Sequence, residues 1–520
     1  MALRLIDNPN HGLGTWPARR ARIAPERTAL LDERRALTYG ELAERTARLA
    51  GTLRRLGVGH GDRVAYLGVN AVEVFETMFA TWLLGAVAVP LNYRLSGTEV
   101  RYMLEDCGAT VLVHSPDTDE LLAAAAPLPA GLHVLAVRPA GGPGQELDYE
   151  AAIAAGPVLE AAPEVVLEDA ALLLYTSGTT GRPKGAVLTH ANLTWNTVNY
   201  VAQVDVLSTD RALCIAPLFH CVGLSQVTLP TLFKGGSVEV LASPEPGLVL
   251  QRVSEAGITS FSAVPTILQM MCEHPSWSTA DLGSLTCVQY GGSPVPERVA
   301  RAWLERGVRL VQGYGMTEAA PGVSMSTDEG TAERPLSVGV PMFFTDVAAF
   351  VDGHPAPFDD QPAELLVRGP NVFSGYWNRP SETSGSFVGQ WFRTGDVLRV
   401  EDGGWAYVVD RVKDMYISGG ENVYPAEVET VLLQLDDVAN CAVVGVPDAR
   451  WGEVGVAFVQ VREGASLTEE QLRGHLGAHL ARYKIPKYLE FVTNLPRSAT
   501  GKIRRVQLRQ HAAEQHPGAR

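Results

Sequence analysis

The sequence predicts an α/β protein with a large N-terminal domain of layered α/β subdomains plus a β-rich subdomain, and a small α+β C-terminal domain. A chain of 520 residues is too long for one ordinary core, so we expect more than one domain. Hydrophobic residues make up 46% and charged residues 19%, as in globular proteins. Short apolar runs alternate with helical patterns along most of the chain, and this alternation is typical of parallel α/β layers.

The first part of the chain shows the alternation most clearly. Residues 40–57 carry leucines on one helical face, which predicts an amphipathic helix. Predicted strands follow at residues 62–67, 85–91 and 110–114, and predicted helices at residues 71–84 and 96–107. The arginines on the outer face of the first helix are expected to be solvated, with weak contact to a membrane surface or an acidic partner as the alternative. These arginines are Arg45, Arg48, Arg54 and Arg55. Residues 121–166 show little periodicity and are expected to be surface connections.

The later part of the chain changes character twice. Residues 341–409 are rich in β-branched and turn residues, and strands are predicted at residues 346–350, 363–368 and 404–409. Beyond them, strands predicted at residues 438–445, 455–461 and 488–493 and a helix predicted at residues 468–480 indicate a compact α+β unit. We therefore expect an N-terminal domain of residues 1–411 and a C-terminal domain of residues 412–520.

Composition excludes several classes of function. The net charge of −15 argues against a nucleic-acid partner and means that any anion site must supply its own positive charge. The six cysteines show no metal-binding spacing, so we expect free thiols in a reducing cytoplasm. The N-terminus lacks the apolar core of a signal peptide. Residues 212–233 carry no formal charge, but their prolines, His220 and Gln226 favour a buried strand and helix near a site over a transmembrane segment.

A loop rich in glycine and hydroxyl groups follows the apolar run at residues 171–174. Glycines allow backbone N–H groups to approach an anion, hydroxyls add donors, and Lys184 adds a mobile positive charge. The candidate phosphate ligands are Thr176, Ser177, Gly178, Thr179, Thr180 and Lys184. Because Gly185 follows Lys184, the loop does not match the Walker pattern. The sequence therefore predicts a phosphate loop of another kind, with an ordinary surface loop as the alternative.

This stretch resembles the phosphate-loop signature of the adenylate-forming enzymes, which comprise acyl- and aryl-CoA synthetases, peptide-synthetase adenylation domains and luciferases. The resemblance extends over nearly the whole chain and looks most like bacterial fatty-acyl-CoA synthetases. It implies ATP, Mg²⁺ and coenzyme A as cofactors. It also implies two half-reactions, in which a carboxylate forms an acyl-adenylate and a thiol then takes the acyl group. Between them the mobile C-terminal domain would rotate about a hinge at Lys413.

Further stretches match the nucleotide site of that family. Glycines flank Tyr314, so a purine could lie against its ring, and the segment at Gly291 and Gly292 would lie along the adenine. Thr317 offers a hydroxyl to a phosphate, and Glu318 offers a hard oxygen ligand for Mg²⁺. A threonine–glutamate pair of this kind is often a helix cap, which is the alternative. The resemblance implies that Asp396 binds the ribose, that Arg411 contacts the nucleotide and that Lys502 offsets charge at the reaction centre. Thr317, Glu318, Lys502 and His220 are thus the candidate catalytic residues.

The resemblance also suggests where the two other substrates bind. The CoA thiol would approach along Ser418, Gly419, Gly420 and Glu421, and Trp451 matches an aromatic residue that stacks on the CoA adenine in some aryl-CoA ligases. Ile485 stands where those enzymes carry a basic residue. The candidate acyl pocket comprises His220, Val222, Phe261, Val264, Gly315 and Met316. His220 resembles a gate residue of that pocket, with a core histidine as the alternative.

The predicted pocket is apolar, since residues 217–223 contain no aspartate to hold an amino group. Each buried CH₂ contributes about 0.8 kcal/mol, so such a pocket would select a hydrophobic acid. The resemblance to bacterial fatty-acyl-CoA synthetases implies a medium- or long-chain fatty acid as the substrate. An aryl or polycyclic acid is an alternative substrate. A carrier-protein thiol is an alternative acceptor to CoA. A non-catalytic acyl- or nucleotide-binding role is disfavoured, because Lys184, Glu318, Asp396 and Lys502 are all present.

Overall fold

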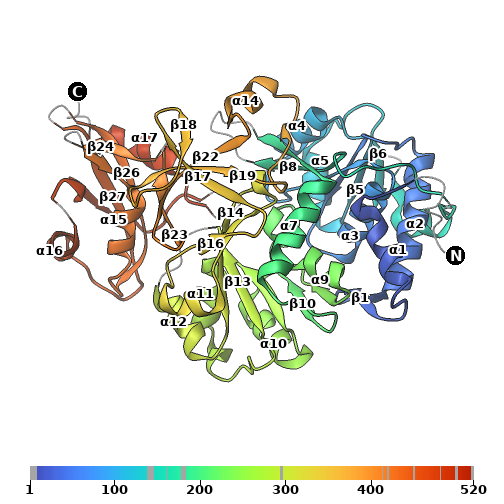
Figure 1. Cartoon of the computed structure of the whole chain (residues 1–520), viewed down its shortest axis with the longest axis horizontal. Helices are drawn as coiled ribbons and strands as arrows, with labels where there is room; N and C mark the ends of the chain where they lie inside the picture. The colour runs from blue at the N-terminus through green and yellow to red at the C-terminus, as the bar shows by residue number, and fades with distance from the viewer. Residues whose placement is uncertain are drawn as a thin grey trace. The chain divides into compact units, whose positions relative to one another are not determined.

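Figure 1 shows the computed structural model of the chain, which confirms the mixed α/β architecture. It describes residues 9–137, 146–159, 161–176, 183–292, 297–412, 414–418, 421–448, 451–480, 482–497 and 502–516, without the side chains of residues 328, 329, 421 and 422. Contacts divide the chain into two compact units, the first of residues 1–346 and 367–392 and the second of residues 347–366 and 393–520. The predicted boundary after residue 411 lies inside the second unit and stays a prediction about which part of the chain moves.

The first unit contains an eight-stranded sheet of order β20-β9-β8-β4-β3-β5-β6-β7. Its strands are β3 (Arg63–Leu67), β4 (Val87–Leu91), β5 (Val111–His114), β6 (His133–Ala136), β7 (Leu147–Asp148), β8 (Ala170–Thr176), β9 (Lys184–Thr189) and β20 (Gly375–Tyr376). From β8 to β7 neighbouring strands are parallel, whereas β9 is antiparallel to β8 and to β20. This order places the segment at residues 375–376 beside the hairpin that carries the predicted phosphate loop.

The same unit contains a nine-stranded sheet of order β16-β15-β14-β13-β12-β10-β11-β1-β2. Its strands are β1 (Thr28–Leu31), β2 (Ala36–Thr38), β10 (Arg211–Cys214), β11 (Ser237–Val240), β12 (Ser260–Ala263), β13 (Cys287–Gly291), β14 (Leu310–Gly315), β15 (Gly322–Met325) and β16 (Val340–Pro341). Strands β10 to β14 are parallel, so their carboxyl ends lie at one edge of the sheet. Gly291 and Gly315 stand at that edge.

Helices cover both faces of the two sheets. The largest core joins α2 (Tyr39–Arg55), α3 (Val72–Leu83), α7 (His190–Gln203), α8 (Cys221–Ser225) and α9 (Thr228–Lys234) to one face of each sheet. The far face of the eight-stranded sheet packs on α4 (Gly97–Cys107) and α5 (Asp119–Ala124). The far face of the nine-stranded sheet packs on α10 (Pro246–Ala256), α11 (Pro265–Glu273) and α12 (Glu297–Glu305). The first unit is therefore layered α/β/α/β/α, as the alternation predicted. Its other helices are α1 (Trp16–Ala21), α6 (Tyr149–Ala154), α13 (Asp328–Glu333) and α14 (Pro380–Gly385).

Strand pairing in the second unit is mostly antiparallel, with a parallel pair between residues 456–459 and 488–491. A six-stranded sheet contains β17 (Asp346–Val351), β18 (His354–Ala356), β19 (Ala363–Arg368), β21 (Phe387–Val388), β22 (Trp391–Val400) and β23 (Ala406–Arg411). A five-stranded sheet contains β24 (Tyr416–Ser418), β25 (Glu421–Val423), β26 (Val438–Asp448), β27 (Gly452–Val461) and β28 (Tyr488–Phe491). One core packs on α15 (Pro425–Leu432) and α16 (Glu469–His479), and another on α17 (Arg505–Gln515).

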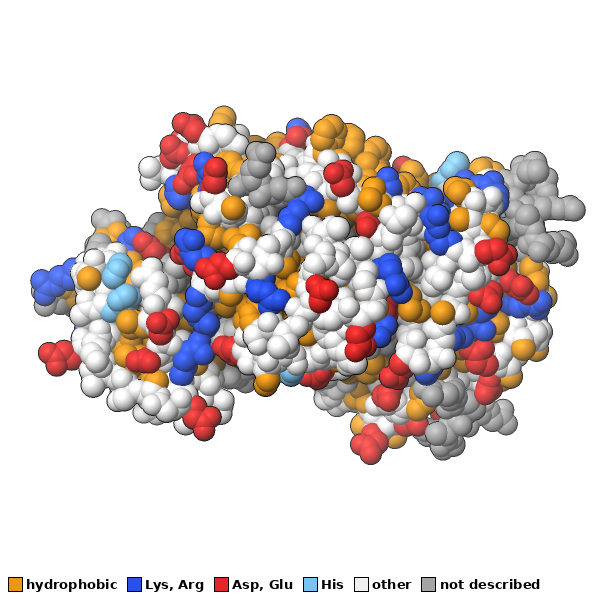
Figure 2. All heavy atoms as spheres, turned by 90° about the horizontal axis from the view of Figure 1, so that it is seen from below, with side chains coloured by type: hydrophobic (Ala, Val, Ile, Leu, Met, Phe, Trp, Pro, Cys, Tyr) orange, Lys and Arg blue, Asp and Glu red, His pale blue; other side chains and the backbone are white. Residues whose placement is uncertain are grey.

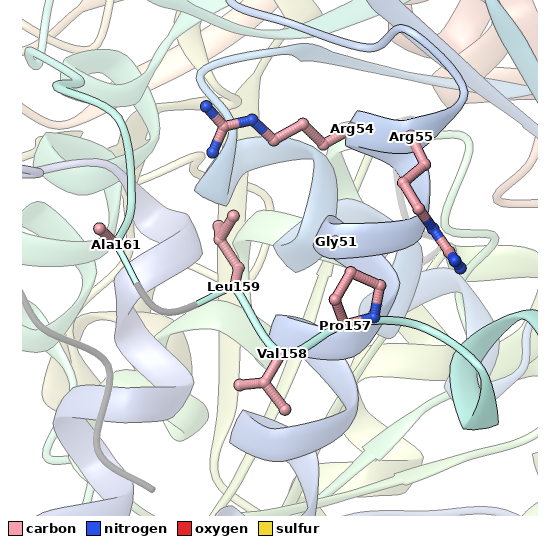
Figure 3. A pocket seen from close by; sticks show the side chains of 7 residues that line it. All are labelled: Gly51, Arg54, Arg55, Pro157, Val158, Leu159 and Ala161. Atoms are coloured by element: carbon pink, nitrogen blue, oxygen red, sulfur yellow. The ribbon is translucent and has the colours of Figure 1, made fainter.

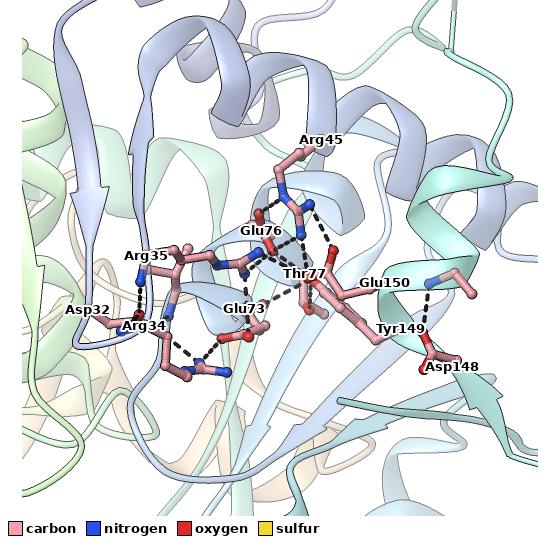
Figure 4. A network of polar contacts seen from close by, with 12 residues as sticks. Asp32, Arg34, Arg35, Arg45, Glu73, Glu76, Thr77, Asp148, Tyr149 and Glu150 are labelled. Carbon is pink, nitrogen blue, oxygen red and sulfur yellow. Dashed lines mark hydrogen bonds and ion pairs between the residues drawn. The ribbon is translucent and has the colours of Figure 1, made fainter. Parts of the chain in front are cut away.

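Two expectations about the first unit were wrong. Residues 121–166 are not only surface connections, because they contain β6, β7 and α6, and Tyr149 and Ile153 are buried in the core. Arg45 is not solvated either. Its guanidinium contacts the fully buried carboxylate of Glu76, and it also bonds to Glu150 at 2.7 Å. These ion pairs connect helices α2, α3 and α6 (Figure 4). The partners of Arg45 are therefore residues far from it in the sequence.

The expectation of free thiols was confirmed. All six cysteines are free thiols, and all except Cys272 are buried. None of the helices in the described part of the chain is long and apolar enough to cross a membrane. On the face shown in Figure 2, acidic and basic side chains are interspersed.

Candidate active site

The predicted phosphate loop connects two paired strands of the first unit. Thr176 at the end of β8 stands opposite Lys184 at the start of β9, and the Thr176 hydroxyl donates to the Lys184 carbonyl at 3.4 Å. Pairing at this position brings the two ends of the loop together, so Thr176 and Lys184 lie on a rigid hairpin. Residues 177–180, which carry the other predicted phosphate ligands, lie outside the described residues.

Lys184 is surrounded by residues that the sequence did not single out. Its ammonium group pairs with the carboxylate of Glu382 on α14 and lies 5.7 Å from the ring centroid of Tyr376 on β20. The Tyr376 hydroxyl donates to Glu318 Oε1 at 2.9 Å. Burial and the neighbouring Glu318 carboxylate raise the pKa of Tyr376, so its hydroxyl stays a donor at neutral pH. Tyr376 thus connects the phosphate-loop lysine to the predicted magnesium ligand.

Glu318 lies in a short 3-10 turn, η4 (Thr317–Ala319), directly after β14. Its carbonyl accepts a hydrogen bond from the Phe373 N–H at 2.8 Å, which ties the turn to the segment preceding β20. The alternative role of Thr317 as a helix cap does not apply, because the turn starts at Thr317 and its N-cap residue is Met316. The Thr317 hydroxyl therefore stays a candidate ligand.

The oxygens of this turn fit magnesium in one particular mode. Among the described residues no group of three His, Cys, Asp or Glu side chains could hold a metal ion. Mg²⁺ is often bound through one or two carboxylates together with substrate phosphates and water. The single carboxylate of Glu318, held by Tyr376, suits that mode.

Glycines at the carboxyl edge of the nine-stranded sheet allow close approach of neighbouring backbone. Gly291 on β13 pairs with Gly313 on β14, and a Cβ at Gly291 would lie 2.3 Å from the Gly313 carbonyl oxygen. A Cβ at Gly315 would lie 1.7 Å from the carbonyl oxygen of Pro321. Both positions therefore require glycine. Gly292 has φ of +84°, which also favours glycine, and Tyr314 follows on the neighbouring strand.

Asp396 and Arg411 form the predicted nucleotide pair of the second unit. They stand opposite each other on β22 and β23, and Arg411 Nε lies 2.9 Å from Asp396 Oδ1. Asp396 is buried, and its backbone N–H donates to the Thr394 hydroxyl at 3.0 Å. The pairing fixes the direction of the carboxylate and the guanidinium. The ribose and nucleotide contacts assigned to them stay predictions.

The neighbouring Asp410 makes the stability of the second unit depend on pH. Its carboxylate accepts hydrogen bonds from the Arg411 and Ala426 N–H groups at 2.7 and 2.8 Å, but burial outweighs them and raises its pKa from 3.8 to about 6. Because folding raises the pKa of Asp410, its protonation stabilises the folded state, fully so at pH values below the pKa of the unfolded chain. This stabilisation is lost as the pH rises through about 6. Between pH 4 and pH 7 the free energy of unfolding should therefore fall by an amount on the order of 2 kcal/mol because of Asp410, and we expect this decrease to be absent in Asp410→Asn. Urea unfolding at both pH values tests this, and an unchanged pH dependence would contradict it.

The C-terminal candidates are placed only in part. Lys502 is exposed and precedes Ile503, which forms a bridge with Arg497. Lys413, Gly419 and Gly420 lie outside the described residues, as does the side chain of Glu421. The buried Ser418 pairs with both Glu421 and Gly452.

Trp451 has a polar neighbourhood that the sequence did not indicate. Its side chain is 45% exposed, and its backbone N–H donates to Asp448 Oδ1 at 3.0 Å. The ammonium group of Lys487 donates to Asp448 Oδ2 at 2.7 Å. A basic residue is therefore present near Trp451, although Ile485 stands at the position where the resemblance would place one.

The predicted acyl-pocket residues differ in their surroundings. His220 precedes α8, and its ring lies 4.6 Å from the Phe219 ring. Val222 and Met316 are half-buried, and Val264 at the start of α11 is 43% exposed. Phe261 is fully buried and packs edge to face on Trp303 at 6.1 Å in the core under α11 and α12. Its placement gives no support to Phe261 as a pocket residue, which stays a prediction.

Gln289 on β13 is a site candidate that the sequence analysis missed. The residue is 1% exposed, yet neither its amide oxygen nor its amide nitrogen has a hydrogen-bond partner in the described structure. Side chains alternate along a strand, so Gln289 shares a face with Cys287, which packs on Tyr200 of α7. Gly291 lies on the same face two residues further on. A buried amide without partners costs about 1–3 kcal/mol, which favours a ligand with polar groups beside it.

A pocket of about 340 Å³ lies elsewhere in the first unit, at the end of α2 (Figure 3). It is lined by Gly51, Arg54, Arg55, Pro157, Val158, Leu159 and Ala161, and it contains none of the predicted site residues. Residue 160, between two lining residues, lies outside the described part of the chain. We therefore assign no function to this pocket.

Comparison with known proteins identifies similar sequences and structures along the whole chain. The model of the AMP-binding enzyme family matches residues 17–377, and that of the AMP-binding enzyme C-terminal domain matches residues 427–502. A feruloyl-CoA synthase of an Amycolatopsis species is 50% identical over 96% of this chain and 99% of its own length. A long-chain-fatty-acid–CoA ligase of Mycobacterium tuberculosis is 34% identical over 96% of this chain and 98% of its own length.

A solved structure agrees with this similarity. The structure of the anthranilate CoA ligase AuaEII in complex with anthranoyl-AMP has a TM-score of 0.89 and 28% sequence identity. The match covers 98% of this chain and 99% of the ligase.

Proposed function

The chain belongs to the AMP-binding enzyme family and is an AMP-forming acid–thiol ligase that uses ATP, Mg²⁺ and CoA, and from this premise we propose that it activates an aromatic carboxylic acid with polar ring substituents. Ferulic acid, whose ring carries a hydroxyl and a methoxy group, is the model substrate for this class. The observation that carries the proposal is the buried Gln289 amide without hydrogen-bond partners. A fatty acid, expected from the sequence, is the second candidate and is supported by the 34% identity to the mycobacterial ligase.

The chemistry of Gln289 favours the aromatic acid. Its amide has one acceptor and two donor positions, which match a phenolic hydroxyl and an ether oxygen. Burying a hydrocarbon chain beside it would leave the amide without partners at a cost of about 1–3 kcal/mol. Gly291, which pairs with Gly313, lies two residues beyond Gln289 on the same face of β13. The higher identity to the feruloyl-CoA synthase, 50%, supports the same class of acid.

The proposed reaction assigns a role to each predicted residue. A carboxylate oxygen of the acid attacks the α-phosphorus of ATP, the bond to the β-phosphate breaks, and pyrophosphate leaves. Lys184, the loop hydroxyls and the Thr317 hydroxyl hold the phosphates, Glu318 would hold Mg²⁺, and Lys502 offsets the charge that develops at the reacting oxygens. Bound Mg²⁺ would neutralise part of the phosphate charge. Asp396 and Arg411 hold the nucleoside.

The second half-reaction transfers the acyl group. The CoA sulfur loses its proton and attacks the acyl carbon, and the bond to AMP breaks. The proposed approach passes Ser418, Gly419, Gly420 and Glu421 after the C-terminal domain rotates about Lys413. Trp451 is proposed to stack on the CoA adenine, and a cytoplasmic location fits the free thiols.

The proposal is tested with matched acids. We expect kcat/KM for ferulate to exceed that for cinnamate, which lacks the ring oxygens, and that for decanoate. In Gln289→Leu the ratio of ferulate to cinnamate should fall by about 10-fold, because one buried polar contact is worth about 1–3 kcal/mol. Gln251→Leu, at an exposed position on α10, is the matched control and should keep the ratio. The rate of thioester formation with CoA gives kcat/KM for the unaltered protein and for both variants.

Two results would contradict the aromatic assignment. One is faster turnover of decanoate than of ferulate by the unaltered protein. The other is a ferulate-to-cinnamate ratio that Gln289→Leu leaves unchanged. Pyrophosphate release that a phosphopantetheinyl carrier protein accelerates more than CoA does would instead favour the carrier-protein acceptor.

A further inference from the structure

The residue that pairs with Lys184 has a second cationic partner. Glu382 lies on α14, where its carboxylate contacts the Lys184 ammonium group with one oxygen, and its other oxygen lies 3.9 Å from Arg379 Nε. Arg379 is itself held by the Tyr102 hydroxyl at 3.1 Å and by Asp106 at 3.7 Å, both on α4. Glu382 therefore stands between a mobile lysine and an anchored arginine.

The backbone around Glu382 is also fixed to the phosphate-loop hairpin. Tyr376 on β20 pairs with Ala186 on β9, two residues after Lys184. The Thr383 hydroxyl, next to Glu382, accepts a hydrogen bond from the Tyr376 N–H at 2.9 Å. The segment that carries Glu382 is thus attached to the strand that carries Lys184, which keeps the two charged groups close to each other.

We propose that Glu382 is an exchangeable counter-ion of Lys184, which the polyphosphate of ATP displaces, so that Glu382 sets the affinity of the site for ATP. A polyphosphate and the Glu382 carboxylate compete for the same ammonium group. When Lys184 turns to a phosphate, Glu382 keeps Arg379 as its partner, which lowers the cost of the exchange. The Tyr376 ring, whose centroid lies 5.7 Å from the ammonium group, adds a cation–π contact that does not depend on Glu382. This inference rests on the proposed role of Lys184 as a phosphate ligand.

Direct binding measurements test the proposal without any acid substrate. The binding of Mg-ATP, of inorganic tripolyphosphate with Mg²⁺ and of adenosine is measured by calorimetry for the unaltered protein and for Glu382→Gln. We expect Glu382→Gln to bind ATP and tripolyphosphate about two- to five-fold more tightly, because it removes a competing ion pair. Adenosine affinity should not change. Glu297→Gln, which removes an exposed carboxylate paired with Arg301 on α12, is the matched control and should match the unaltered protein.

The outcomes separate this inference from the proposed function. Unchanged or weaker ATP binding in Glu382→Gln, with Lys184→Ala binding ATP more weakly than the unaltered protein, overturns the counter-ion role alone. Unchanged ATP binding in Lys184→Ala overturns the phosphate-ligand role of Lys184 and the inference with it. Tighter binding in Glu382→Gln supports the inference, because damage to the fold would weaken binding instead. Raising the salt concentration should reduce the difference in ATP affinity between the unaltered protein and Glu382→Gln.

Discussion

Replacing Lys502 with alanine is expected to slow acyl-adenylate formation by about 10²- to 10³-fold, the usual effect of removing one preorganised donor that stabilises transition-state charge. The attack of a carboxylate on the α-phosphorus brings two anions together, and only a cation near the reacting oxygens offsets that repulsion. Lys502 is exposed beside the Arg497–Ile503 bridge, so its loss should not disturb a core. Single-turnover pyrophosphate release with ferulate and Mg-ATP measures the effect.

The second half-reaction provides the internal control. Supplied feruloyl-AMP should be converted to the thioester at a nearly unchanged rate by Lys502→Ala, since the proposed rotation withdraws Lys502 before the thiol attacks. Lys502→Arg keeps the charge and should retain more of the first half-reaction than alanine does. Equal impairment of both half-reactions in Lys502→Ala would contradict the two-conformation mechanism.

Replacing Glu76 with glutamine is expected to destabilise the first unit by about 3 kcal/mol, because breaking a buried ion pair leaves its partners without compensation. The Glu76 side chain is fully buried between Arg35 and Arg45, and its carboxylate also accepts a hydrogen bond from the Tyr149 hydroxyl at 3.2 Å (Figure 4). These contacts attach α6 to α2 and α3. The free energy of unfolding in urea measures the loss.

An exposed ion pair on α2 provides the control for Glu76 on α3. Glu44 pairs with Arg48 at 2.9 Å, and 60% of its side chain is exposed. Glu44→Gln should therefore change the free energy of unfolding by about 0.5 kcal/mol or less. Arg45 also acts on the half-exposed Glu150 carboxylate at the edge of the network. Burial alone would raise the pKa of Glu150, but the hydrogen bond and charge of Arg45 lower it overall. If Glu76→Gln cost no more than Glu44→Gln, the network would not hold α6 in place.

Sequence periodicity was sufficient for most elements of the layered core. The predicted strand at residues 110–114 appears as Val111–His114, and the helix at residues 96–107 as Gly97–Cys107. Such elements have strong apolar patterns because both faces of a parallel sheet are buried. The region at residues 121–166 lacked that signal, since β7 has only 2 residues and α6 has only 6 and is rich in alanine. Their structure depends on packing against α2 and α3, which no local pattern encodes.

From the sequence alone, alternating apolar and helical patterns indicated the fold class. The family resemblance carried by the phosphate loop and the stretches around Glu318, Asp396 and Lys502 indicated an acid–thiol ligase, because these motifs are contiguous in the sequence and can be recognised without the fold. Only the tertiary structure revealed Glu382 and Tyr376 beside Lys184, and the unpartnered amide of Gln289. Tyr376 and Glu382 lie nearly 200 residues beyond Lys184 in the sequence, and a glutamine on a strand looks like any other polar residue. Their roles depend on burial and on neighbours brought together by sheet pairing, and these are properties of the folded chain.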